Sequence, residues 1–210
     1  MRARPISPDR LVAELCARIT AFPRDHRVRV AFDGADAARP GDLADALVAP
    51  LRASGRAAAR VSARDFLRPA SLRLEMGRED PDAFYDDWLD ARALDREVLG
   101  PLEPGGTGKI LPSLWDADRD RATRAPYLDL PEGGVLLLDG PLLLGRWLPF
   151  DLTVHLSLSR AALARRTPPE AAWTLPAFDR YRAEVDPVAV ADVAVTADDP
   201  RHPALVVAAD

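Results

Sequence analysis

The sequence is short of lysine, of cysteine and of long hydrophobic runs, and each shortage excludes a class of protein. Lys109 is the one lysine among 28 basic residues, so chemistry that needs a lysine has a single candidate. Cys16 alone cannot form an internal disulfide, which suits a reducing compartment. Apolar runs such as residues 135–138 are far shorter than the roughly 20 residues of a membrane helix, and residues 1–9 show no secretory signal. We therefore expect a cytoplasmic protein without a membrane partner.

The overall composition is typical of a globular protein. The chain has 210 residues, of which 48% are hydrophobic and 29% are charged. Its net charge of −5 argues against a nucleic-acid partner, because neutralising phosphates requires clustered positive charge. We expect a single domain over residues 1–210 that does not bind nucleic acid.

Apolar periodicity and turn residues predict alternating helices and strands. Ser7 and Pro8 begin a helix in the N-terminal segment 1–26, and Asp42 opens a second helix that runs towards Gly55. Further helices are predicted over residues 81–99, 159–166 and 168–185. The predicted strands are residues 28–32, 57–66, 134–140, 151–158 and 188–196.

Strands separated by helical crossovers indicate an α/β protein with a mainly parallel sheet. In such sheets the ligand lies at the carboxyl ends of the strands. Three of the predicted strands end at an aspartate, namely Asp33, Asp65 and Asp139. The sequence therefore predicts that the functional site lies at the carboxyl ends of these strands.

A strand that runs into a glycine turn and then a helix is the context of a phosphate-binding P-loop. At this point the chain resembles the uridine kinase and phosphoribulokinase-like family of P-loop kinases, over about residues 27–207. No single segment is specific, but their order and spacing are. The segments are 28–34, the Asp-Phe motif at 64–69, 77–88, 101–106, the second nucleotide motif at 137–143, and 181–200.

The resemblance implies a P-loop NTPase-like parallel sheet with helices on both faces. It also implies a substrate-side insertion at about residues 69–131 and a lid-like helical region at about 159–187. The implied activity is ATP-dependent phosphorylation of a nucleoside 5′-hydroxyl, with Mg²⁺ as the metal.

The P-loop itself departs from the family pattern. When G-x-x-x-x-G-K-[ST] is laid from Gly34, Arg39 stands at the second glycine, Pro40 at the lysine and Gly41 at the hydroxyl residue. Proline has neither a charge nor an N–H, and the planar fork of arginine does not replicate a lysine in a glycine cradle. Losing the cation and the metal-binding hydroxyl together costs on the order of 10⁴ in rate. The glycine-rich segment 105–109 does not replace the loop, because no strand precedes its lysine.

The resemblance also implies roles for individual residues. Asp65 would be the general base for the attacking hydroxyl, and Asp139 would lie near Mg²⁺ or its waters; both could equally be turn residues at strand ends. ATP would contact the residues of the loop, of the following helix start and of the lid, which are Gly34, Arg39, Gly41, Asp42, Arg165 and Arg166. The two lid arginines could instead be cations that interact with a helix dipole.

The nucleoside would be held by Arg68, Arg78, Tyr85 and Trp88, through ring stacking and guanidinium hydrogen bonds. Tyr85 and Trp88, three residues apart on one predicted helix, could instead belong to the core. No metal ligands are predicted, since His26, His155 and His202 are isolated in the sequence.

Three functions remain open at this point. The first is a uridine kinase-like phosphotransferase. The second is a catalytically inactive descendant that binds a nucleoside or nucleotide, or acts as a regulator. The third is a protein that binds another phosphorylated ligand at the N-terminus of the helix over residues 42–54, where the dipole and backbone donors persist.

Overall fold

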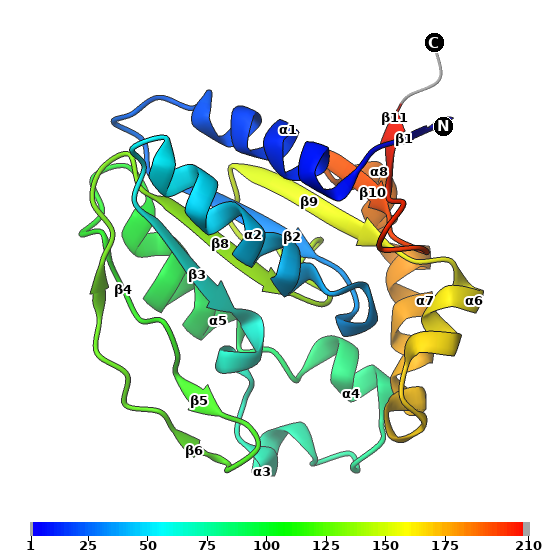
Figure 1. Ribbon diagram of the computed structural model, residues 1–210. Helices are drawn as coiled ribbons and strands as arrows, with labels where there is room; N and C mark the ends of the chain where they lie inside the picture. Colours follow the sequence, from blue (N-terminus) through cyan, green and yellow to red (C-terminus); the bar gives the residue numbers. More distant parts are fainter. Residues whose placement is uncertain (1, 208–210) are drawn as a thin grey trace.

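The computed structural model describes residues 2–207; Met1 and residues 208–210 of the expected domain lie outside the described residues. Its centre is a seven-stranded sheet with the order β1-β11-β10-β9-β2-β8-β3 (Figure 1). The strands are β1 (Arg2–Pro5), β2 (Val28–Asp33), β3 (Ala58–Ser62), β8 (Val135–Gly140), β9 (Leu152–Ser157), β10 (Val193–Thr196) and β11 (Ala204–Val207). β3, β8, β2, β9 and β10 are parallel, whereas β11 and β1 extend the sheet in antiparallel pairing.

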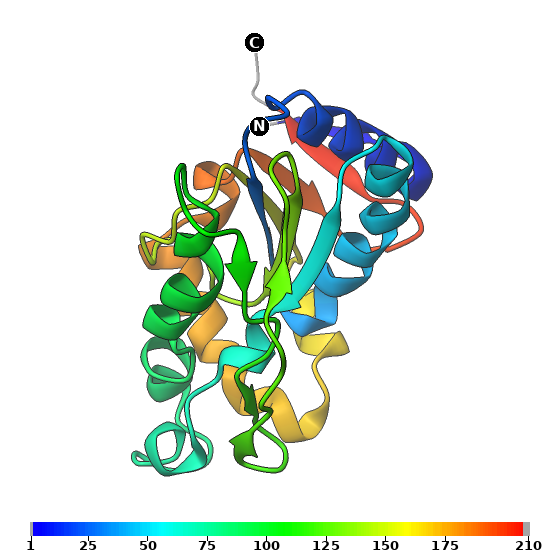
Figure 2. The same cartoon turned by 90° about the vertical axis from the view of Figure 1, so that its left-hand side faces the viewer.

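Helices cover both faces of this sheet, as expected from the sequence. Consecutive residues of a strand point to opposite faces, so the fully buried β2 contributes to two separate hydrophobic clusters. α1 (Pro8–Thr20) and α2 (Pro40–Ala53) pack on one face. α5 (Ala91–Leu94) and the π-turn over Asp95–Leu99 pack on the other, on the opposite side of the sheet in Figure 2. Each fully buried leucine in these clusters stabilises the fold by about 1.5–3 kcal/mol.

The helix starts follow local chemistry. The Ser7 hydroxyl accepts a hydrogen bond from the Arg10 backbone N–H, and Pro8 occupies the first turn of α1. α2 begins at Pro40, two residues before the predicted start, because proline is tolerated where no intrahelical N–H bond is needed. Pro50 lies inside α2 without ending it.

Three predicted elements differ from the structure. The helix expected over residues 81–99 is divided, because the Asp90 side chain accepts from the Ala93 N–H and starts a new helix, α5, after α4 (Pro81–Asp86). β3 ends at Ser62, and a 3₁₀ turn (Ala63–Phe66) follows it. The last predicted strand, over residues 188–196, begins only at Val193, since α8 (Pro187–Val190) occupies its first part.

The remaining elements are short. Between β3 and β8 lie α3 (Ala70–Arg73), a 3₁₀ turn (Gly100–Leu102), and the two-stranded pairs β4 (Lys109–Ile110) with β7 (Leu128–Asp129) and β5 (Trp115–Asp116) with β6 (Arg121–Ala122). Between β9 and α8 lie α6 (Arg160–Arg166), a 3₁₀ helix (Pro169–Thr174) and α7 (Leu175–Glu184). None of the helices in residues 2–207 combines the length and the apolar character needed to cross a bilayer.

A buried ion pair joins β2 to the start of β9. The Asp151 carboxylate accepts hydrogen bonds from the Arg29 backbone N–H at 2.8 Å, from Nε at 3.0 Å and from Nη2 at 2.9 Å. His26 Nε2 lies 3.1 Å from the same carboxylate. Burial raises the pKa of Asp151, but the hydrogen bonds from Arg29 outweigh it, so the pKa lies below its usual value.

We predict that Asp151→Asn lowers the free energy of unfolding by about 3 kcal/mol, because the buried Arg29 guanidinium keeps only the exposed Glu103 carboxylate, 3.7 Å from its Nη1, as a counter-ion. Since the pKa of Asp151 is depressed in the folded state, the wild-type pair stabilises the fold above pH ~4 and its contribution falls as the pH drops through the folded pKa. Urea denaturation at several pH values measures both effects. The control is Asp25→Asn, at an exposed position, where a change below about 0.5 kcal/mol is expected; equal losses in both variants would contradict the prediction.

Candidate functional site

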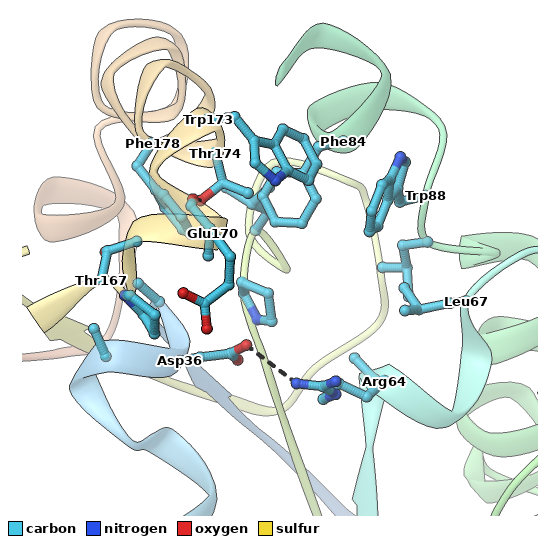
Figure 3. Close-up of a pocket in the computed structure, with 18 of the residues that line it drawn as sticks. Asp36, Arg64, Leu67, Phe84, Trp88, Thr167, Glu170, Trp173, Thr174 and Phe178 are labelled. Carbon is cyan, nitrogen blue, oxygen red and sulfur yellow. Dashed lines mark hydrogen bonds and ion pairs between the residues drawn. The ribbon is translucent and has the colours of Figure 1, made fainter. Parts of the chain in front are cut away.

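A cavity of about 580 Å³ lies at the carboxyl ends of β2, β3 and β8 (Figure 3). Its walls come from four segments that are far apart in the sequence: the turn after β2, the turn after β3 with α4, the loop after β8, and the segment that joins α6 to α7. The lining side chains used below are Asp36, Arg64, Phe84, Trp88, Arg146, Glu170, Ala171, Trp173 and Phe178. This is the edge at which parallel sheets bind ligands.

The turn after β2 has the P-loop's place and length but not its side chains. Residues 34–41 form a 3₁₀ turn (Asp36–Ala38) and enter α2 through Arg39, whose φ of 59° lies in the left-handed region that glycine adopts most easily. The Arg39 guanidinium is exposed and pairs with Asp42, outside the cavity lining. Gly34 packs closely against β9, since a Cβ there would lie 3.0 Å from the Leu156 carbonyl oxygen.

The guanidinium of Arg60 lies against Gly41 at the start of α2. A Cβ on Gly41 would overlap Arg60 Nη2 and would lie 3.1 Å from Asp139 Oδ2. Arg60 Nε donates to Asp139 Oδ1 at 2.7 Å, Nη1 donates to Asp45 at 3.0 Å, and the Ser62 hydroxyl lies 3.3 Å from Asp139 Oδ2. Asp139 is therefore a buried carboxylate whose charge is compensated by an arginine of the neighbouring strand.

No family model and no curated protein matches the sequence. Among solved structures, the chain is similar to a protein from Bacillus stearothermophilus described as a possible uridine kinase, with a TM-score of 0.71 and 20% identity over 87% of this chain and 96% of that one. It is also similar to a protein from Silicibacter sp. TM1040 assigned as a fructose transport system kinase (TM-score 0.62, 25% identity, 78% and 87% covered). A third neighbour is the YGR205w protein (TM-score 0.55, 12% identity, 89% and 90% covered).

This chain has a P-loop kinase-like fold. The resemblance read from the sequence is thus confirmed at the level of the fold. Within this fold, the residues present do not fit Mg²⁺ and a triphosphate. Pro40 supplies no cation or N–H, Gly41 supplies no hydroxyl, and Arg60 already holds Asp139. Nor do any three His, Cys, Asp or Glu side chains within residues 2–207 come together as a metal site.

Asp65 lies in the 3₁₀ turn after β3, beside the cavity but not in its lining. Its Oδ1 accepts a hydrogen bond from the Ser113 hydroxyl at 3.2 Å. Burial raises the pKa of Asp65, and the hydrogen bond from Ser113 offsets part of this effect. A carboxylate with a raised pKa suits a general base, so the role predicted for Asp65 stays open to test.

The structure brings one of the four predicted substrate residues, Trp88, into the cavity wall. Tyr85 faces α7 instead, with its ring 6.2 Å from that of Tyr181. Arg68 contacts Asp87 at 3.5 Å, and Arg78 is exposed without an ion pair in the described part of the chain.

The two predicted lid arginines also lie outside the cavity lining. Arg165 is exposed at the end of α6. Arg166 donates to the backbone carbonyls of Ala197 and Asp198, and so fastens α6 to the segment after β10. Both also lie where cations interact favourably with the helix dipole, which was the alternative interpretation.

Four aromatic side chains come together in one part of the cavity wall. Phe84 of α4 and Trp88, two residues after that helix, meet Trp173 at the end of the segment between α6 and α7, with ring centroids 5.3–5.7 Å apart. Phe178 of α7 lies 6.0 Å from Phe84. Such edge-on pairs contribute about 0.5–1.5 kcal/mol each. Sequence reasoning missed Trp173 and Phe178, because only the fold brings the two segments together.

Charged groups mark the side of the cavity next to the loop. Asp36 points into it and pairs with Arg64 at 3.4 Å, while the Glu170 carboxylate approaches Asp36 from the opposite wall (Figure 3). Glu170 forms no ion pair within residues 2–207. Two carboxylates therefore face the place where a P-loop kinase holds phosphates.

Asp33, at the end of β2, is fully buried, and its hydrogen bonds join three segments next to the cavity. Its carboxylate accepts from the Leu143 N–H at 2.8 Å and from the Tyr181 hydroxyl at 3.1 Å, and Oδ2 lies 2.6 Å from His155 Nδ1. Burial and then the Asp33 charge raise the pKa of Tyr181, so its hydroxyl remains a donor. The Tyr181 oxygen in turn accepts from the Leu144 N–H at 3.0 Å.

We predict that Gly41→Ala lowers the free energy of unfolding by about 1 kcal/mol, because the new Cβ displaces the Arg60 guanidinium, which is held by Asp139 and Asp45. In an Arg60→Ala background the same change is neutral or stabilising, since alanine is the better helix former. A double-mutant cycle by urea denaturation measures the coupling. Equal effects of Gly41→Ala in both backgrounds would show that Arg60 does not occupy this space.

Proposed function

We propose that this chain binds a small planar molecule of the nucleoside class in the aromatic cavity and does not transfer phosphate. The observation that carries the proposal is the position of Arg60, whose guanidinium fills the space beside Gly41 and holds the Asp139 carboxylate. In an active P-loop kinase, the lysine, the hydroxyl residue and the metal act on the phosphates. Here an internal ion pair satisfies the charges instead.

Electrostatics at the loop support the same conclusion. A triphosphate would approach Asp36 and Glu170, and like charges brought together repel. Arg64 already compensates Asp36, and Arg39, which does not line the cavity, pairs with Asp42. The positive charge that must offset a triphosphate is therefore not directed at this side of the cavity.

The rest of the cavity suits a neutral ring system. Its volume of about 580 Å³ lies within the range of small-molecule sites, which are mostly apolar with a few placed polar groups. Stacking of a base on aromatic side chains contributes about 1–3 kcal/mol per base. Trp88 and Trp173 supply such surfaces, and Thr167 and Thr174 add hydroxyls to the lining.

A second candidate is ATP-dependent phosphorylation of a nucleoside. Two observations favour it: the turn over residues 34–41 keeps its length and leads directly into α2, and burial raises the pKa of Asp65 as a general base requires. The two candidates differ in a single measurable step, the transfer of phosphate from ATP.

We predict that any phosphoryl transfer from ATP to uridine or other nucleosides is at least about 10⁴-fold slower than the roughly 1–100 s⁻¹ of kinases. Incubation with γ-labelled ATP and Mg²⁺, followed by separation of the products, measures it. Nucleoside phosphorylation that Asp65→Ala abolishes would establish the second candidate instead.

We predict that Ala171→Phe weakens binding of uridine at least tenfold, because the new ring occupies the cavity that Ala171 lines. Ala172→Phe is the matched control, since the neighbouring Ala172 is exposed and does not line the cavity. Calorimetric titration of both variants gives the affinities. The same loss in both, or in neither, would place the nucleoside elsewhere.

A further inference from the structure

Arg146 lines the cavity and is a cation without a carboxylate partner. It lies in the loop that follows β8, where its Nε donates to the Leu142 carbonyl at 2.7 Å and its Nη2 donates to the Tyr85 carbonyl. Its guanidinium also lies 5.9 Å from the centre of the Tyr85 ring. Nη1 has no hydrogen bond to any group in residues 2–207.

The carboxylates nearest to Arg146 are committed to other partners. Asp33 is held by His155, Tyr181 and the Leu143 N–H, as described above. Asp86 of α4 pairs with Arg180 of α7 at 2.8 Å. No ion pair joins either carboxylate to Arg146 in the described part of the chain, and burial lowers the pKa of the guanidinium.

Arg146 is half-buried, and a charge that is partly removed from water without a counter-ion is unfavourable. Two backbone carbonyls and a ring face compensate it only in part. An anionic group that enters the cavity would supply the missing partner, and the free Nη1 would donate to it. Arginine suits this task because its planar fork matches the oxygens of a carboxylate or a phosphate.

Negative charge is thus in excess on one side of the cavity, where Arg64 pairs with one of two carboxylates, and positive charge lies on the other side. Asp36 and Glu170 stand at the loop where a kinase binds phosphates, and the uncompensated cation stands on the loop after β8, beside α4. An anionic group is repelled from the first side and attracted to the second. This difference fixes the direction in which a charged ligand can lie.

We propose that Arg146 binds an anionic group of the ligand, a carboxylate or a phosphate, while the ring system of that ligand packs on Trp88 and Trp173. The inference rests on the proposed function and deepens it: the ligand is an aromatic molecule that carries one small anionic group, held away from the P-loop position.

Calorimetric titration of the full chain with three probes tests this assignment. Uridine is the neutral probe, uridine 5′-monophosphate adds a phosphate to it, and orotidine adds a carboxylate to its base. We expect at least one of the anionic probes to bind at least tenfold more tightly than uridine, and the probe that does so identifies the group. Its affinity falls between 50 and 500 mM salt, while the affinity for uridine does not.

Arg146→Gln keeps a donor for the Leu142 carbonyl but removes the charge. We expect it to weaken binding of the anionic probe about 10–100-fold, and to weaken binding of uridine much less. Arg146→Lys keeps the charge and retains part of the preference for the anionic probe over uridine. The control is Arg92→Gln, at an exposed position of α5 outside the cavity, which retains the whole preference. Thermal unfolding confirms that each variant is folded, and the salt series on the wild-type protein does not depend on the variants.

The outcomes separate this inference from the proposed function. Anionic probes that bind no more tightly than uridine, or a preference that survives in Arg146→Gln, overturn the role of Arg146 and leave nucleoside binding standing. Absence of binding by all three probes contradicts the proposed function and this inference together.

Discussion

The functional edge of this protein depends on one buried carboxylate. Asp33 ends the central strand β2 without any exposure to solvent, and its hydrogen bonds reach the loop after β8, the strand β9 and the helix α7. A buried charge is stable only when it is fully paired, so these three elements can hold their positions only together. The loop that carries Arg146 and the helix that carries Phe178 are both set by this network.

Near the Asp33 network, two arginines of this chain pair with carboxylates at the carboxyl ends of the strands. In an active P-loop kinase, substrates and metals compensate the charges of this region. Arg60 joins Asp139 to α2, and Arg64 joins Asp36 to the turn after β3. A side chain at position 41 would displace the Arg60 guanidinium from its place beside Gly41. The loop over residues 34–41 and the neighbouring strand β3 are therefore joined by ion pairs. Although the loop has no lysine, the buried Asp139 carboxylate is paired.

Much of the fold could be predicted because its central strands are continuous apolar runs bounded by turn residues, as in residues 134–140. β1 and β11 could not, since β1 is exposed throughout and ends in a proline, so no hydrophobic pattern marks it. At the site, the sequence indicated the degenerate loop and Trp88. It could not indicate Arg146 or Glu170, because their significance comes from contacts between segments that are far apart along the chain, and single arginines and glutamates carry no local signal.

The order of the strands has a consequence for synthesis. β2 is made early, yet both of its neighbours in the sheet, β8 and β9, lie in the later part of the chain. Until they emerge from the ribosome, the apolar side chains of β2 have no partner strand, which is the situation in which nascent strands aggregate. The outermost pair, β1 with β11, joins Arg2 to Val207 and must form last. A nascent chain of this protein therefore has no complete binding cavity until α7, which carries Phe178, has been made.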